Sequence, residues 1–322
     1  MLLTNTELCY YDSEILRLPA DKRKEYHAQV DRLIAELSRS IRNKTEIKIT
    51  KVVKAGSFAK FTILRKTSTD PVDVDVVFYI SGRNIDRETL QGLNDTIYDL
   101  LVKIYPNKDV EDFEIQRKAA TVSFVGTGLS VDIVPVIEDE NRPGYGWQFD
   151  LQDGSKIQTC APCQIQFVRD RKAADKDFRT LVRLAKKWRN HAELKPLKSF
   201  AIELIMAHVL DKEGVGGTIE QRFRRFLLYI ARSGLKAVIS FPENTAPYGP
   251  EGPTVRNRTL AYFPHYSGDG SRAAVERSKV WFSNQHGDWK RLPVRLNVSI
   301  AVCCRTRQAT AAPPLASVFP AL

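Results

Sequence analysis

Hydrophobic and polar positions follow two different periods in the first half of the chain. Apolar residues recur every three or four positions over 12–43 and 86–105, which predicts two amphipathic helices. The first is expected to be one long helix with a Pro-Ala-Asp start that resembles an N-terminal cap. Between and after them, β-branched segments predict strands at 47–57, 72–80, 118–125 and 129–137. Residues 1–160 are therefore expected to form a mixed α/β unit that begins with a long helix.

Helical periodicity dominates the second half. Helices are predicted at 175–192, 199–212 and 218–233, so residues 161–250 are expected to form a helical domain. Residues 251–322 are rich in Pro, Gly and Arg and show no clear period. We interpret them as an atypical C-terminal segment, either diverged or read in a shifted frame.

Composition narrows the class of protein. The 322 residues are 43% hydrophobic and 27% charged, which excludes a collagen, a coiled coil and a disulfide-rich mini-protein. The chain shows neither an apolar run of about 18 residues nor a basic, apolar leader, so a cytoplasmic protein is expected. Its net charge of +11 indicates an anionic partner such as nucleotide phosphates, nucleic acid or an acidic membrane.

Cysteine usage adds one local pattern. Five cysteines, an odd number, are more typical of a reducing compartment than of a secreted disulfide framework. Cys160 and Cys163 have the spacing of a zinc knuckle or a redox pair. No second Cys-x-x-Cys or close His pair completes a four-ligand zinc site.

Acidic residues interrupt two of the predicted strands. Asp73 and Asp75 are two apart, so the pleat directs both carboxylates to the same side. Two adjacent carboxylates repel each other unless a cation such as Mg²⁺ neutralises them, although a strand with one solvated face shows the same alternation. Asp132 is the lone acid within an otherwise apolar strand. If the strands are neighbours, these three carboxylates converge as phosphoryl transfer with two metal ions requires.

A Gly-Ser pair precedes the acidic strand. Gly56 and Ser57 follow a predicted strand and come 16 residues before Asp73. Glycine lets backbone amides approach phosphate oxygens closely, and a serine hydroxyl can donate to them. Alone, the Gly-Ser pair is typical of an ordinary turn. Followed at this spacing by Asp-x-Asp and a third Asp, it becomes a specific signal for a phosphate-binding turn.

Together these residues resemble a known family. Gly56-Ser57, Asp73-x-Asp75 and Asp132 look like the signature of the DNA polymerase β-like nucleotidyltransferases. The segments LVRLAKKW and PLKSFAIELI resemble those of oligoadenylate synthases, of cyclic GMP-AMP synthase and, above all, of the bacterial CD-NTases, the SMODS-type oligonucleotide cyclases of CBASS antiphage systems. The resemblance covers about residues 40–245 and implies a two-lobed α+β fold with a mixed-sheet catalytic core and a helical second lobe.

The resemblance also implies roles for individual residues. Asp73, Asp75 and Asp132 would be catalytic and would hold two Mg²⁺, which Mn²⁺ could replace. The residues implied to bind the nucleotide are Gly56, Ser57, Lys60, Lys186 and Ser199. Lys54 and Arg65 would add positive charge near the Gly-Ser turn, and an amide from the segment around Gln164 and Gln166 would read a base.

From the residues alone, the helical-lobe positions have plainer explanations. Arg179, Arg183 and Lys186 share one helix face, and such a basic face is usually a solvated one. Ser199, which follows Pro196 and precedes an apolar helix, is typical of an N-cap. Family members commonly continue into a segment that closes over the cleft, and the residues after 250 do not resemble it.

The function implied is an Mg²⁺-dependent enzyme that condenses NTPs into a cyclic di- or oligonucleotide, releasing pyrophosphate, in bacterial antiphage signalling. The alternatives are an RNA-primed nucleotidyltransferase, like CCA-adding enzymes or poly(A) polymerases, and an inactive nucleotide- or RNA-binding homologue. Expected partners are NTPs, a downstream cyclic-nucleotide effector and CBASS regulatory proteins. No obligatory nucleic acid and no membrane are expected, and the protein is expected to be a monomer. The sequence does not specify the bases, ring size or linkage.

Overall fold

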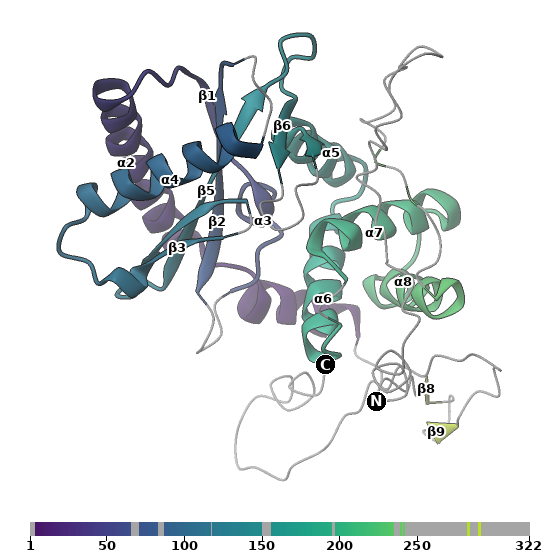
Figure 1. The fold of residues 1–322 in the computed structure, drawn as a ribbon. Helices are drawn as coiled ribbons and strands as arrows, with labels where there is room; N and C mark the ends of the chain where they lie inside the picture. The colour runs from purple at the N-terminus through teal and green to yellow at the C-terminus, as the bar shows by residue number, and fades with distance from the viewer. Residues whose placement is uncertain are drawn as a thin grey trace, which may run out of the picture. The chain divides into compact units, whose positions relative to one another are not determined.

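The computed structural model describes residues 4–65, 71–82, 87–116, 118–149, 156–194 and 197–234, with residues 239 and 241 and the backbone of 282–283 and 289–290 (Figure 1). Contacts divide the chain into two compact units. One is Leu18–Asp170; the other combines the described residues up to Arg17 with those from Arg171 onward. Strands β8 (Phe282–Ser283) and β9 (Trp289–Lys290) pair antiparallel. Otherwise, the interpretation of residues 251–322 lies outside the described residues.

A mixed sheet organises the unit Leu18–Asp170. Its strands are β1 (Ile49–Lys54), β2 (Val72–Ile80), β3 (Phe113–Ile115), β4 (Ala120–Phe124), β5 (Leu129–Glu138), β6 (Gly146–Phe149) and β7 (Lys156–Thr159). The order is β1-β2-β5-β4-β3, with β6 pairing β5 and β7 pairing β6. Because β2 and β5 run parallel and the other pairs antiparallel, the predicted mixed sheet is confirmed.

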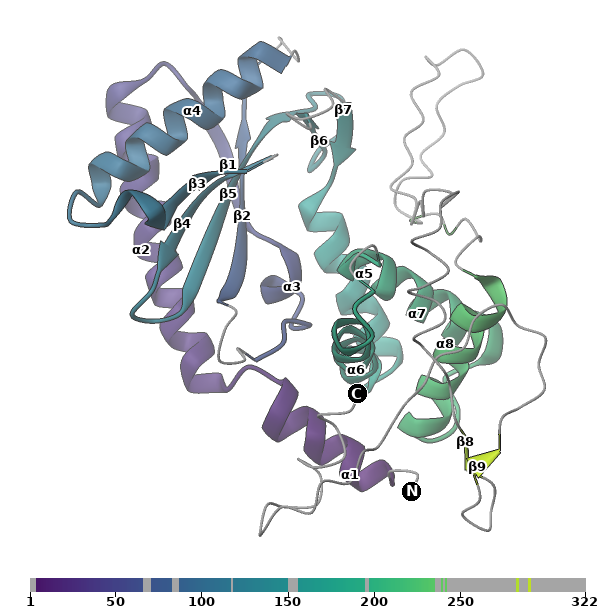
Figure 2. The same ribbon diagram turned by 60° about the horizontal axis from the view of Figure 1, so that its bottom comes forward.

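Helices cover the sheet unequally. The helices of this unit are α2 (Ala20–Lys44), α3 (Gly56–Ala59), α4 (Arg87–Ile104), the 3₁₀ turn η2 (Val110–Asp112) and the start of α5 (Ala161–Ala174). Figure 2 shows α2 and α4 on one side of the sheet and the short α3 on the other. The chain passes from this unit to the other one within α5.

The main core lies between the sheet and helices α2 and α4. It is built from alternate residues of the strands and one stripe of each helix, including Val72, Val74, Val76, Val131, Ile133, Leu33, Leu37, Ile97 and Leu101. Since side chains alternate along a strand, the residues between these valines and isoleucines face the other side. Asp73, Asp75 and Asp132 are among them.

The long helix predicted within 12–43 is α2, and its Pro-Ala-Asp start is confirmed; residues 12–16 belong instead to a separate turn. The structure has a π-helical turn η1 (Tyr11–Leu16), an extended Arg17 with ψ of 134°, and α2 beginning after Pro19. Proline disfavours helical geometry at the residue before it, so the helix stops before Leu18 and restarts at Ala20. The break coincides with the boundary between the two units.

The second unit is helical, as predicted. It contains α1 (Asn5–Tyr10), η1, α6 (Phe178–His191), α7 (Ser199–Glu213) and α8 (Ile219–Ser233). Trp188 of α6 packs edge-on against Phe226 of α8, with ring centroids 6.1 Å apart. The N-terminal segment joins this unit: the Asn5 side chain accepts the N–H of Ile219 at 2.9 Å. None of the helices in the described ranges has the length and apolar character needed to cross a membrane.

Candidate active site

The strand register places the three acids on one face of the sheet. Asp75 of β2 lies directly opposite Asp132 of β5, and Asp73 lies opposite Ser130. Residues that are opposite each other on adjacent strands point to the same face. The condition set by the sequence, that the two acidic strands are neighbours, is therefore met, and the acids point away from the core formed with α2 and α4.

Gly56 lies against the Asp75 carboxylate. Its φ is +60°, and a Cβ built on it would lie 1.6 Å from Asp75 Oδ2. The N–H of Ala55 also donates to the carbonyl oxygen of Asp75, at 2.7 Å. Only glycine combines this backbone angle with this close approach. The Gly-Ser turn is thus positioned by the strand that carries the acidic pair.

The rest of the turn is folded compactly. The Ser57 carbonyl oxygen accepts the N–H groups of Thr62 and Ile63, at 3.0 and 3.1 Å. Lys60, which the sequence placed near the phosphates, is buried, with 4% of its surface exposed. Phe61 adopts a positive φ of 61°.

The cationic side chains near the Gly-Ser turn differ in part from Lys54 and Arg65, the two proposed from the sequence. Lys54 forms an ion pair with Asp31 of α2 at 2.7 Å and contacts His27 Nδ1 at 3.1 Å. Arg23, which was not identified from the sequence, donates to the carbonyl oxygen of Phe58 at 2.9 Å and stacks 3.9 Å from the ring centre of Phe61. Arg23 therefore supports the turn from α2.

Thr121 holds the third acid. It lies opposite Asp132 on β4, is buried, and donates from Oγ1 to Asp132 Oδ1 at 2.6 Å. Burial raises the pKa of the Asp132 carboxyl; the bond from Thr121 opposes this, the charge of Glu114 adds to it, and the net shift is upward. Thr121 was missed from the sequence, although its position between apolar Ala120 and Val122 is a usable signal.

The acids suit a hard divalent cation in type and in strand position. All three offer carboxylate oxygens, the donors that Mg²⁺ prefers, from one face of two adjacent strands. The close approach of Gly56 also fixes one side of the Asp75 carboxylate. Across the described ranges, however, no three His, Cys, Asp or Glu side chains are grouped closely enough to hold a metal ion as they stand. The strand positions of the three acids thus fit a divalent ion, while their side chains are not close enough together to coordinate one as they stand.

Lys186 and Ser199 belong to the second unit. Lys186 of α6 is 3% exposed and its Nζ lies 3.4 Å from Oε1 of Glu203, which is fully buried on α7. Ser199 is the first residue of α7, and its Oγ accepts a bond from Arg189 at 3.2 Å. The N-cap is Lys198, so the N-cap explanation of Ser199 was wrong. Their contact with a triphosphate stays a prediction.

The basic face of α6 is not simply solvated. Arg183 is 3% exposed and binds Asp12 through Nε to Oδ1 and Nη2 to Oδ2, both at 2.6 Å. Burial raises the pKa of Asp12, but Arg183, Arg17 and Thr180 outweigh it, and the pKa lies below its usual value. Arg183 therefore anchors the N-terminal segment instead of lying on a solvated face.

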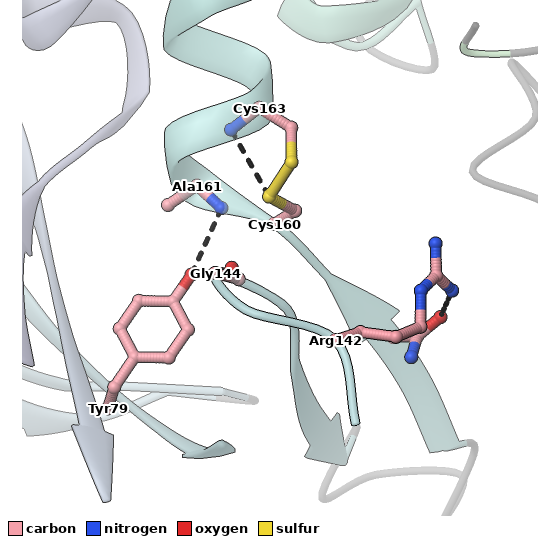
Figure 3. The surroundings of a disulfide bond; sticks show 7 residues. Tyr79, Arg142, Gly144, Cys160, Ala161 and Cys163 are labelled. Carbon is pink, nitrogen blue, oxygen red and sulfur yellow. Dashed lines mark hydrogen bonds between the residues drawn. A yellow bond between two sulfur atoms is a disulfide. The ribbon is translucent and has the colours of Figure 1, made fainter. Parts of the chain in front are cut away.

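Cys160 and Cys163 are joined by a disulfide at the start of α5, as Figure 3 shows. Their thiolates are thus not available as zinc ligands in this state, and the cysteine count alone gave no sign of the bond. On the same helix, Gln166 is exposed and donates to Asp170 at 2.6 Å. The base-reading role of this segment stays a prediction.

Comparisons with known proteins agree with this architecture. Residues 16–165 match the model of the Second Messenger Oligonucleotide or Dinucleotide Synthetase (SMODS) domain. The chain is 67% identical over 245 residues to the CBASS oligonucleotide cyclase CdnC of Escherichia coli KTE188, covering 76% of this chain and 78% of the relative. It is 35% identical over 234 residues to a cyclic AMP-AMP-AMP synthase of E. coli MS 115-1, covering 71% of each.

Solved structures show the same fold. E. coli MS115-1 CdnC with ATP superposes with a TM-score of 0.62 at 32% identity, covering 78% of each chain. The same enzyme in complex with a HORMA protein gives a TM-score of 0.62 at 32% identity, covering 75% of each chain. The polymerase β-like fold expected from the sequence is confirmed. With its acidic strand pair, its Gly-Ser turn and these relatives, the chain belongs to the CD-NTases, the nucleotidyltransferase family of CBASS oligonucleotide cyclases.

Proposed function

We propose that the protein condenses NTPs, with ATP among them, into a cyclic di- or oligonucleotide and releases pyrophosphate at each step, using Mg²⁺, in antiphage signalling. The observation that carries the proposal is the register of β2 and β5, with Asp75 opposite Asp132 and Asp73 on the same face. ATP is chosen because one relative is named a cyclic AMP-AMP-AMP synthase and another was solved with ATP.

In this proposal Asp73, Asp75 and Asp132 hold two divalent ions. When bound, such ions lower the pKa of an attacking hydroxyl and stabilise the charge of a leaving pyrophosphate. Thr121 donates to one oxygen of Asp132, which would leave the other oxygen for a bound ion. Because Gly56 has no side chain, the Asp75 carboxylate can lie directly against the turn.

The donor triphosphate is assigned to the Gly-Ser turn and to the second unit. Ser57 would donate to phosphate oxygens with Lys60 nearby, while Lys186 and Ser199 would contact the β and γ phosphates. Glu203 holds the Lys186 ammonium in a buried ion pair, which limits its orientations. Arg189 does the same for the Ser199 hydroxyl.

Regulation is proposed by analogy with the named relatives. One solved relative is a CdnC:HORMA complex, so a HORMA-type regulatory protein is the partner to test first. The released cyclic nucleotide would act on a separate effector. We propose a cytoplasmic monomer that needs no nucleic acid and no membrane for its activity.

The test is a product analysis with a matched control. Full-length protein is incubated with labelled NTPs and Mg²⁺ without RNA, treated with phosphatase, and the products are identified by mass spectrometry. We expect phosphatase-resistant cyclic products, lost with EDTA and in the Asp73→Ala, Asp75→Ala double variant, but kept in Asp99→Ala, an exposed acid on α4. Products that require an RNA primer would support an RNA-extending enzyme instead. An unchanged profile in the double variant would refute the metal assignment.

A further inference from the structure

The Cys160–Cys163 disulfide lies where a helix begins. Cys160 immediately precedes Ala161, the first residue of the 14-residue helix α5, and Cys163 lies in the first turn. The backbone N–H of Cys163 donates to the sulfur of Cys160 at 3.2 Å. Cys160 thus occupies the N-cap position, and its sulfur receives the bond that a capping oxygen usually receives.

The two sulfurs differ in exposure and in the charge they can carry. Cys160 is 4% exposed, whereas Cys163 is half-buried. A thiolate at a helix N-terminus is stabilised by the free N–H groups and the helix dipole. The structure provides one such N–H directly at Cys160. Cys160 is therefore the better leaving group, and Cys163, the more exposed residue of the two, is the one that we expect an external thiol to attack.

We propose that this pair is a thiol–disulfide exchange site for low-molecular-weight thiols of the glutathione class. A thiolate attacks Sγ of Cys163, the Cys160–Cys163 bond breaks, and Cys160 leaves as a thiolate at the start of α5. A second thiolate then attacks the thiol-derived sulfur of the mixed disulfide, releasing Cys163 and a small-molecule disulfide. Two thiols are oxidised to one disulfide while the protein disulfide is reduced to two thiols, so the electrons balance.

The surroundings tie the pair to the strand that carries the acids. Tyr79 of β2 is fully buried; its hydroxyl donates to the Gly144 carbonyl at 2.9 Å and accepts the N–H of Ala161 at 3.2 Å (Figure 3). Burial raises the pKa of Tyr79 to about 12, so the hydroxyl stays a donor at neutral pH. A Cβ built on Gly144 would lie 3.7 Å from the Cys160 sulfur, so this loop covers it.

Ala161 extends the connection to the Gly-Ser turn. It packs in one buried cluster with Ala55, Val77, Tyr79 and Val136. Ala55 is next to Gly56, and Val77 is two residues beyond Asp75 on the same face of β2. The start of α5 thus shares a buried cluster with neighbours of the residues of the candidate active site, although the exchange itself does not depend on the proposed enzymatic function.

Thiol trapping on the full-length protein tests the proposal. The wild type is equilibrated with glutathione and its disulfide at several ratios, quenched with acid, alkylated and mapped by peptide mass spectrometry. We expect a reversible passage between disulfide and dithiol at residues 160 and 163. Cys160→Ser should accumulate glutathione on Cys163, whereas Cys163→Ser should show little on the buried Cys160. Exposed Cys9 serves as the internal control for reagent access.

Two results would overturn the proposal. One is a Cys160–Cys163 pair that stays fully reduced in oxidised glutathione or fully oxidised in reduced glutathione. Either result would mean that the pair does not exchange with glutathione at any ratio tested. The other is equal glutathione uptake by the two single variants, which contradicts the assigned roles of the sulfurs. The wild-type titration answers the first question even if a variant does not fold. Since neither readout is catalytic, a protein without cyclase activity leaves this test intact.

Discussion

Replacing Thr121 with valine tests the support of the third acid. Valine has nearly the shape of threonine but lacks the hydroxyl that donates to Asp132 Oδ1 at 2.6 Å. A hydrogen bond to a charged group contributes about 1.5–3 kcal/mol, which corresponds to about a 10- to 150-fold change in an equilibrium or rate. A loss of this size matches that expected for a partner that orients a metal ligand, about 10- to 100-fold.

The assay measures kcat/KM for cyclic product formation and, separately, Mn²⁺ binding by electron paramagnetic resonance. We expect both to fall in Thr121→Val and to recover in Thr121→Ser, which keeps the hydroxyl. The bond from Thr121 lowers the pKa of Asp132, so its loss raises that pKa. The ionised carboxylate is the active form, and the acidic limb of the pH–rate profile should therefore move to higher pH.

The Asp132→Ala variant distinguishes an error about the positioning role of Thr121 from an error about the metal site. In an Asp132→Ala background, Thr121→Val should have no further effect on Mn²⁺ binding, because the two act as one unit. A Val variant that binds and reacts like wild type would refute the positioning role of Thr121. An Asp132→Ala variant with normal Mn²⁺ binding would refute the metal site itself. Thermal unfolding of each variant shows whether the fold is retained.

Two further substitutions have defined outcomes. Gly56→Ala should abolish product formation, because its Cβ would lie 1.6 Å from Asp75 Oδ2 at a positive φ. The control Gly92→Ala, which has open space around it on α4, should keep activity and stabilise the protein by up to about 1 kcal/mol. An active Gly56→Ala variant would contradict the close approach of Gly56 to Asp75. Asp12→Asn should lower the free energy of unfolding by about 3–5 kcal/mol, because it removes the carboxylate charge from the buried Asp12–Arg183 ion pair. Since the folded-state pKa of Asp12 is depressed, its contribution to stability is present above the ordinary aspartate pKa of 3.8 and is lost as pH falls below it toward the folded-state pKa. Melting curves from pH 6 to pH 3 should therefore fall less in Asp12→Asn than in wild type, and parallel curves would refute this.

The strands that carry the acids were predictable, but their pairing was not. The β-branched runs 72–80 and 129–137 correspond to β2 and β5 almost residue for residue. Their registration, which places Asp75 opposite Asp132, depends on contacts between segments far apart in the chain. From the residues, the meeting of the three acids was predicted only on the condition that the two strands are neighbours, and the resemblance to a family supported it. Thr121 was missed because the signal it gives, a polar residue between two apolar ones, is common in strands.

Buried charges account for other differences. In the sequence, Arg183 and Lys186 were interpreted as part of a solvated basic helix face. The acids that bind them, Asp12 and Glu203, lie on other elements. Periodicity shows which residues share a helix face and not which segment covers it. The start of α2 was predictable because Pro-Ala-Asp marks it, whereas the separate turn η1 before it was not predicted.

The path of the chain between the units has a consequence for synthesis on the ribosome. Asp12 binds Arg183 across a separation of 171 residues, and every residue of the sheet unit lies between them in the sequence. At translation rates of about 5–20 residues per second, the first helical turns wait roughly 10–30 seconds for α6 to emerge. The sheet unit can complete its core in that interval. Tags or truncations before residue 18 are therefore expected to disturb the unit that is finished last.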